Sequence, residues 1–187
     1  MKRSVFHWQR VDMPGLERLV LERTDTGIVA TSTVLCLEAG GYRLDYVWDF
    51  DPSWQTRSVS IRRRGENGET SRLLERKDGN WYVDGSLRED LACVDHPDLS
   101  VTPFCNTPPI LDLSSHAGDE LTIATAFIDG NDLSVGKSSQ KYVRRGPLLV
   151  RYVDLGLSKG FEADLAIDEA GFVLDYEGLF KRVTPAA

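Results

Sequence analysis

The sequence predicts a mainly β fold in which a highly curved, many-stranded antiparallel sheet, a β-roll, wraps around a single α-helix. Three observations predict it. Apolar and polar residues alternate with period two in many short runs, glycine-containing turn signals separate those runs, and only one stretch has the pattern of a helix. The 187 residues suit one domain, and we expect a single domain over residues 1–187.

The strand signal is clearest over Tyr42–Phe50, where five apolar side chains point one way while Arg43, Asp45, Val47 and Asp49 point the other. Short runs with the same pattern lie on both sides of it. They are Ser4–Val11, Leu16–Arg23, Ile28–Leu37, Gln55–Arg63, Ser71–Lys77, Glu120–Ile128, Gln140–Arg145, Leu148–Val153, Phe161–Ile167 and Phe172–Tyr176.

The breaks between these runs contain residues that tolerate positive φ. They are Gly40-Gly41, Asn67-Gly68, Asp78-Gly79, Asp84-Gly85 and Asp129-Gly130. Short strands joined by short turns predict an antiparallel meander, which must curl or close to cover its apolar face. No repeat of 20 to 50 residues interrupts this order.

The segment 90–118 breaks the strand rhythm. Asn106 or Thr107 can cap a helix whose first turn accepts Pro108 and Pro109, because those positions have no intrahelical partner to lose. Apolar residues follow, and Gly118 can end the helix. We expect this helix to plug the curved sheet.

Composition limits the class of partner. The formal net charge of −7 argues against a nucleic-acid partner. Arg62, Arg63 and Arg64 form the one basic run, but alternation along a strand prevents all three from sharing a face. No apolar run is long enough to span a membrane, and polar residues interrupt the start of the chain before a signal-peptide core can form, so we expect a cytoplasmic protein.

Sequence motifs for cofactors and common catalytic machinery are missing. Cys93, His96 and Cys105 lack the paired spacing of a zinc site, and free buried cysteines with a loop histidine are the simpler interpretation. The chain has no nucleophile elbow, phosphate-binding loop or dinucleotide fingerprint. We therefore expect no metal, no cofactor and no assigned catalytic residue.

Acidic side chains are the first candidates for ligand binding. Asp45 and Asp49 share one face of their predicted strand; they line a cavity if that face is concave and contact only solvent if it is convex. Asp95 and Asp98 lie in the irregular segment, where either ligand contact or turn formation explains them.

Two further residues have open roles. Trp54 can line a cleft for a lipid or sugar, or fill the core as many β-protein aromatics do. Asn106 can cap the helix or contact a ligand. The candidate ligand-binding residues are thus Asp45, Asp49, Asp95, Asn106 and Trp54.

The stretch Val101-Thr102-Pro103-Phe104-Cys105-Asn106-Thr107-Pro108-Pro109-Ile110 resembles the Thr-Pro-Phe-x-Asn-Thr-x-Pro-Ile signature of the putative glycolipid-binding family, formerly a bacterial domain of unknown function. This chain departs from the family at Cys105, Pro109 and Asp112. Further matching pieces occur in the same order as in the family. They are Gly15-Leu16-Glu17, Asp51 with Trp54 and Arg57, Asp78-Gly79-Asn80-Trp81, Phe161–Asp168 and Tyr176–Arg182.

The resemblance implies a β-roll around one helix, an acidic pocket, a tight homodimer and a distant likeness in fold to lipoprotein localisation factors. It implies a role in glycolipid metabolism. The lipid carriage of localisation factors outside the cytoplasm is not implied, because shared architecture alone does not transfer function.

Three functions follow as hypotheses. The chain binds a glycolipid-like or other sugar-bearing amphiphile in a partly acidic cavity. Alternatively, it is a carboxylate-dependent enzyme of the glycoside hydrolase type acting on the same ligand class, or a dimeric interaction module with no ligand.

Overall fold

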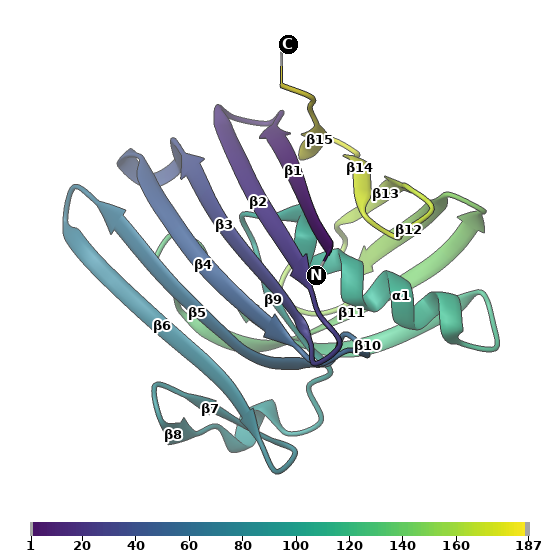
Figure 1. The fold of residues 1–187 in the computed structure, drawn as a ribbon, viewed down its shortest axis with the longest axis horizontal. Helices are drawn as coiled ribbons and strands as arrows, with labels where there is room; N and C mark the ends of the chain where they lie inside the picture. The colour runs from purple at the N-terminus through teal and green to yellow at the C-terminus, as the bar shows by residue number, and fades with distance from the viewer. Residues whose placement is uncertain (1, 186–187) are drawn as a thin grey trace.

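The computed structural model describes residues 2–185, which form one 15-stranded sheet and one α-helix. The first half of the sheet is an antiparallel meander (Figure 1). Its strands are β1 (Lys2–Arg10), β2 (Gly15–Arg23), β3 (Ile28–Cys36), β4 (Tyr42–Phe50), β5 (Thr56–Gly65), β6 (Gly68–Lys77), β7 (Asn80–Val83) and β8 (Ser86–Leu87).

The second half returns to the first strand. It comprises β9 (His96–Leu99), β10 (Glu120–Ile128), β11 (Val135–Gly146), β12 (Leu149–Asp154), β13 (Glu162–Ile167), β14 (Val173–Tyr176) and β15 (Phe180–Arg182). Because β15 pairs with β1, the order across the sheet is β8-β7-β6-β5-β4-β3-β2-β1-β15-β14-β13-β12-β11-β10-β9. Only the pairing of β9 with β10 is parallel among the described residues, so the sheet is mixed rather than wholly antiparallel.

The turns have the predicted chemistry. Asp78 and Gly79 both have positive φ between β6 and β7, as do Asp84 and Gly85 between β7 and β8. Two consecutive residues with positive φ form the type of tight turn whose twist suits a hairpin. The predicted β-rich meander is confirmed, with positive φ also at Gly40, Gly41 and Gly68. Asp129 and Gly130 depart from the prediction, because neither has positive φ.

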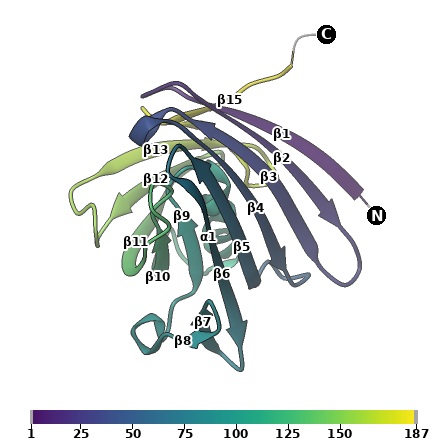
Figure 2. The same cartoon turned by 90° about the vertical axis from the view of Figure 1, so that its left-hand side faces the viewer.

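The sheet curls around α1 (Thr107–Ser115), which lies inside the curve in both views (Figures 1 and 2). A 3-10 turn, η3 (Pro103–Asn106), leads into it. Asn106 occupies the N-cap position of α1, one of the two predicted alternatives, but its side chain makes no capping hydrogen bond. Thr102 instead caps η3 by accepting a hydrogen bond from Phe104 N at 3.1 Å. The helix also ends at Ser115, before Gly118.

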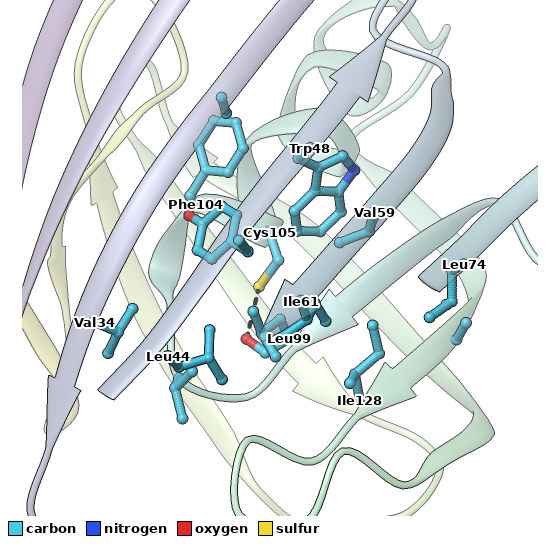
Figure 3. Close-up of a cluster of buried hydrophobic side chains, with 14 of the residues drawn as sticks. Val34, Leu44, Trp48, Val59, Ile61, Leu74, Leu99, Phe104, Cys105 and Ile128 are labelled. Atoms are coloured by element: carbon cyan, nitrogen blue, oxygen red, sulfur yellow. Dashed lines mark hydrogen bonds between the residues drawn. The ribbon is translucent and has the colours of Figure 1, made fainter. Parts of the chain in front are cut away.

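The core fills the concave side of the sheet. Strand β4 buries Tyr42, Leu44, Tyr46, Trp48 and Phe50 and turns the residues between them outward. Phe104 from η3 packs edge-on against Trp48, with ring centroids 5.9 Å apart, at the centre of this core (Figure 3). Covering the concave face with η3 and α1 leaves the convex face of β1–β6 exposed along alternate residues.

Candidate functional site

A cavity of about 270 Å³ opens between the helical segment and the second half of the sheet. Strand β9, η3 and their connection supply one wall, and β12, β14 and β15 supply the other. Its polar wall residues are Asp98, Ser100, Thr102, Asn106, Asp154 and Ser158. Its aromatic wall residues are Phe127, Tyr152, Phe161, Tyr176 and Phe180.

Asp98, on β9, is a half-buried carboxyl group in the cavity wall. Cys105 Sγ donates to its Oδ1 across 3.0 Å, and Gln140 Nε2 donates to its Oδ2. Burial raises the pKa of Asp98; these two hydrogen bonds oppose the shift, and the nearby charge of Asp154 adds to it. A protonated Asp98 can both donate and accept a hydrogen bond toward the cavity.

Asp154 ends β12 and, unlike Asp98, is fully buried. Its Oδ1 accepts hydrogen bonds from Gly156 N at 2.8 Å and Ser158 N at 3.0 Å, while Tyr152 OH donates to its Oδ2 at 3.2 Å. This carboxyl group therefore contacts the cavity and also holds the first turn of the following loop. The two acids have different surroundings. Asp98 accepts hydrogen bonds from a thiol and a side-chain amide, whereas Asp154 accepts them from two backbone amides and a phenol.

The aromatic rings form a continuous group around the two acids. Tyr152 lies 5.6 Å from Tyr142 and 6.0 Å from Tyr176, measured between ring centroids, and Phe161 lies 6.4 Å from Tyr176. Burial raises the pKa of Tyr142, Tyr152 and Tyr176, so these phenols stay protonated. Tyr142 donates to Asn106 and Tyr152 donates to Asp154. The cavity thus combines ring faces with carboxyl and hydroxyl groups.

A second buried acid, Glu17 on β2, adjoins this wall. Its Oε1 accepts hydrogen bonds from Ser32 and Tyr46, both at 2.7 Å, and Tyr46 OH lies 3.3 Å from Thr102 Oγ1. Burial raises the pKa of Glu17 to about 7 against these hydrogen bonds. Thr102 lines the cavity, so polar contacts run continuously from Glu17 to the site.

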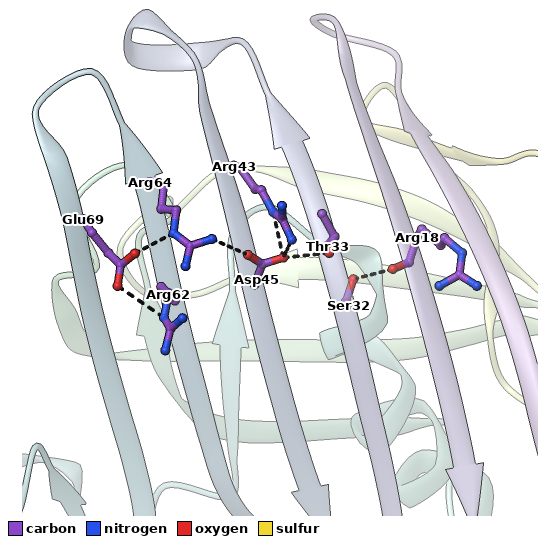
Figure 4. A network of polar contacts seen from close by, with 8 residues as sticks. All are labelled: Arg18, Ser32, Thr33, Arg43, Asp45, Arg62, Arg64 and Glu69. Carbon is purple, nitrogen blue, oxygen red and sulfur yellow. Dashed lines mark hydrogen bonds and ion pairs between the residues drawn. The ribbon is translucent and has the colours of Figure 1, made fainter.

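The predicted site residues Asp45 and Asp49 lie on the convex face, away from this cavity. Asp45 accepts hydrogen bonds from Thr33 at 2.7 Å and from Arg43 at 2.9 Å in a polar row that includes Arg64 (Figure 4). Its partial burial acts to raise its pKa, but the hydrogen bonds outweigh that effect and leave the pKa lowered. Asp49 lies 3.9 Å from Arg57. The concave alternative for this pair is wrong, because the aromatic residues of β4 occupy the concave face.

The other predicted residues have separate positions. Asp95 is exposed and accepts a hydrogen bond from Ala124 N at 3.0 Å, which joins it to β10. Trp54 packs in the core, with its ring centroid 5.3 Å from Phe50, and does not line the cavity. Only Asn106 lies in the cavity wall, where its Oδ1 faces Tyr142 OH at 2.9 Å.

The remaining candidates have structural partners. His96 is buried, and its Nε2 lies 2.7 Å from Asp112 Oδ2, a contact that joins β9 to α1. Arg63 lies over the ring of Tyr42 at 4.3 Å, on the opposite face from Arg62 and Arg64, as alternation predicts. Within residues 2–185, no three acidic, histidine or cysteine side chains gather as metal ligands.

Sequence reasoning did not identify Glu17, Gln140 and Asp154 as site residues, although a signal was present. Each is a polar residue at a position where the alternation of its strand places a buried side chain. Glu17 points the same way as Leu19, Gln140 the same way as Tyr142, and Asp154 the same way as Tyr152. An acid in phase with core residues is a costly arrangement that polar partners must offset. The strand pattern alone could therefore have singled them out.

Comparisons with known proteins support a family assignment. Residues 5–182 match the family described as "Putative glycolipid-binding". A search of curated proteins finds no match. Among the described residues, no helix combines the length and apolar character that crossing a membrane requires.

Two solved structures share the fold. A DUF1089 family protein from Pseudomonas aeruginosa is 28% identical, with a TM-score of 0.77 over 90% of this chain and 92% of that one. A β-barrel-like protein of the domain of unknown function DUF1849 from Brucella abortus is 10% identical, with a TM-score of 0.55 over 97% and 95%, and shows the fold alone. Because the family match spans nearly its whole length, the chain belongs to the family described as "Putative glycolipid-binding".

Proposed function

We propose that the cavity binds the sugar head group of a glycolipid-like amphiphile. The observation that carries this proposal is the wall itself, in which Asp98 and Asp154 stand beside the rings of Tyr152 and Tyr176. Sugar rings have hydroxyl groups at their edges, which pair with carboxyl oxygens, and less polar C–H faces, which pack on aromatic rings. The family description points to the same ligand class.

The cavity volume favours a head group over acyl chains. Sites for drug-sized ligands usually measure about 300–1,000 Å³, and this cavity of about 270 Å³ falls just below that range. Such a space suits roughly one sugar ring. Acyl chains attached to that ring would extend past the rim.

The Asp98→Asn variant tests the proposal. Its carboxyl group contacts the cavity, and the carboxamide replaces one acceptor oxygen by an NH2 group, so a buried ligand hydroxyl left without its partner costs about 1–3 kcal/mol. We expect a roughly tenfold or greater loss of affinity for the best ligand in a panel of short-chain alkyl glycosides, measured by titration calorimetry. The matched control is Asp45→Asn on the convex face, which should bind as the wild type does. Equal affinities for both variants would contradict the proposed site.

The ligand class can be identified directly. Native mass spectrometry of gently purified protein, followed by solvent extraction, should reveal a stoichiometric sugar-bearing lipid. A clean protein that takes up nothing from a lipid extract would contradict lipid binding and favour a soluble sugar.

A second candidate function is glycoside hydrolysis, favoured by two carboxyl groups with different surroundings in one cavity. In that reaction a protonated Asp98 would donate its proton to the leaving oxygen while Asp154 assists the attacking water. The test is chromatography of a bound glycoside after prolonged incubation. Intact ligand would leave binding as the function.

We further infer a homodimer, as the sequence resemblance implies, and a cytoplasmic location. The three cysteines, two buried and one exposed, form no disulfide, which suits a reducing compartment. Exposed apolar side chains on the convex face support a contact with a second copy.

A further inference from the structure

The loop between β12 and β13, residues 155–161, exposes an unusual amount of apolar surface for its length. Leu155 is 41% exposed, Leu157 is 60% exposed and Phe161 is 37% exposed. Single exposed leucines are ordinary on a protein surface, whereas three large apolar residues within seven positions form a local apolar projection.

The same loop forms part of the cavity rim. Ser158 and Phe161 line the cavity and are also exposed to solvent, so both lie where the cavity opens. A head group that enters the cavity must pass this rim, and its attached chains would leave beside the exposed leucines.

The loop is held in one conformation rather than left loose. Asp154 Oδ1 accepts from two of its amides, and Ser138 Oγ accepts from Leu157 N at 3.1 Å. Gly156 approaches β11 so closely that an added Cβ would lie 2.3 Å from Ser138 Oγ. These contacts fix the backbone, so the leucines are presented to solvent without the entropic cost of ordering a mobile loop on binding.

The charge of the loop favours a lipid surface as its partner. Lys159 is the one charged residue in 155–161, although the chain as a whole carries a net charge of −7. Leucine, phenylalanine and lysine together are typical of segments that enter the interface of an anionic bilayer.

We propose that the β12–β13 loop docks the cavity mouth onto an anionic lipid bilayer, so that a glycolipid head group enters the cavity while its chains stay among the lipids. This inference rests on the proposed head-group site but concerns a different surface. The loop inserts Leu155 and Leu157, and Lys159 contacts the lipid phosphates.

The test is sedimentation with vesicles of phosphatidylcholine and phosphatidylglycerol. We expect the wild type to sediment and the double variant Leu155→Ser with Leu157→Ser to lose about tenfold or more in partitioning, because two leucine side chains no longer enter the bilayer. The matched control is Leu148→Ser with Leu149→Ser, whose leucines are 45% and 37% exposed. That pair lies at the other end of β12, roughly 17 Å along the strand from Asp154, and should sediment as the wild type does.

Three results would overturn the docking proposal: a wild type that does not sediment, a loop variant that sediments normally, or a control that loses as much as the loop variant. Calorimetry with a soluble glycoside separates this proposal from the head-group site, because the loop variant should keep its affinity for a ligand without long chains. Vesicle binding without glycoside binding would contradict the head-group site and leave the docking surface standing.

Discussion

Glu17 is a carboxyl group at a position where its strand otherwise buries leucine. It is 2% exposed, and its Oε2 has no hydrogen-bond partner, so the ionised form is poorly solvated. The folded chain therefore holds the Glu17 proton up to a pH of about 7, whereas the unfolded chain releases it near the ordinary pKa of 4.5. Between these values the folded state binds more protons, so stability falls as the pH rises.

The Glu17→Gln variant should remove this dependence. A shift of this size corresponds to about 3 kcal/mol, lost by the wild type between pH 4.5 and about 7 and not recovered above it. We expect urea unfolding to show that the variant becomes more stable than the wild type, by about that amount, as the pH is raised from 4.5 to 8. Glu22→Gln, on the convex face of β2, keeps Glu17 and is the control. Parallel pH profiles for Glu17→Gln and the wild type would refute the argument.

At the scale of single elements, agreement between sequence and structure followed the regularity of the alternation. Strands β4 and β10 have the predicted bounds, and β1, β2 and β3 differ from theirs by one or two residues at one end or both. The longest strand, β11, was predicted only over Gln140–Arg145, because its first five residues do not alternate. Strands β7, β8, β9 and β15 have two to four residues and were not predicted, since so few positions rarely show a period. The four-residue strand β14 is the exception, because it falls within the predicted run Phe172–Tyr176. Strand β9 also pairs in parallel with β10, a long-range contact that local pattern does not encode.

The turn η3 plugs the first half of the sheet mainly through Phe104. This ring is fully buried, and its centroid lies within 6.4 Å of those of Trp48, Phe50, Trp54 and Phe172. We expect Phe104→Ala to lower the free energy of unfolding by about 3–5 kcal/mol, because a large cavity would remain. Denaturant unfolding measures this loss.

Phe161→Ala provides the contrast for that experiment. Phe161 is a partly exposed ring at the cavity rim, so its removal should cost about 1 kcal/mol or less of stability while weakening glycoside binding. Similar stability losses for the two variants would contradict the plug role of η3.

The site itself exists only at the scale of the whole molecule. Asp98 and Asp154 are 56 positions apart in sequence, and they line one cavity because only β10 and β11 separate β9 from β12 in the curled sheet. Gln140 on β11 connects them, since it pairs with Asp154 and its side chain donates to Asp98. Sequence pattern predicted a curled sheet with a plug, but it does not say which concave positions face one another. For the same reason the pattern could raise the acidic face of β4 as a candidate without showing that this face is convex.

The proposed homodimer is also a property of the whole molecule. Leu16, Leu35 and Leu37 line an open apolar hollow on the convex face, and Leu35 and Leu37 are 52% and 66% exposed. The neighbouring polar row contains both arginines and acids, so two copies related by a two-fold axis can meet without facing like charges (Figure 4).

Replacing Leu35 and Leu37 by serine should therefore convert the dimer into a monomer of 20.9 kDa, because the contact loses its apolar centre. Size-exclusion chromatography with light scattering measures the mass directly. The Leu148→Ser and Leu149→Ser control should remain dimeric, since those residues lie on a different part of the sheet. A wild-type mass of 20.9 kDa at every concentration would contradict the dimer. Because the cavity is built entirely within one chain, that result would leave the head-group site and the loop at its rim unaffected.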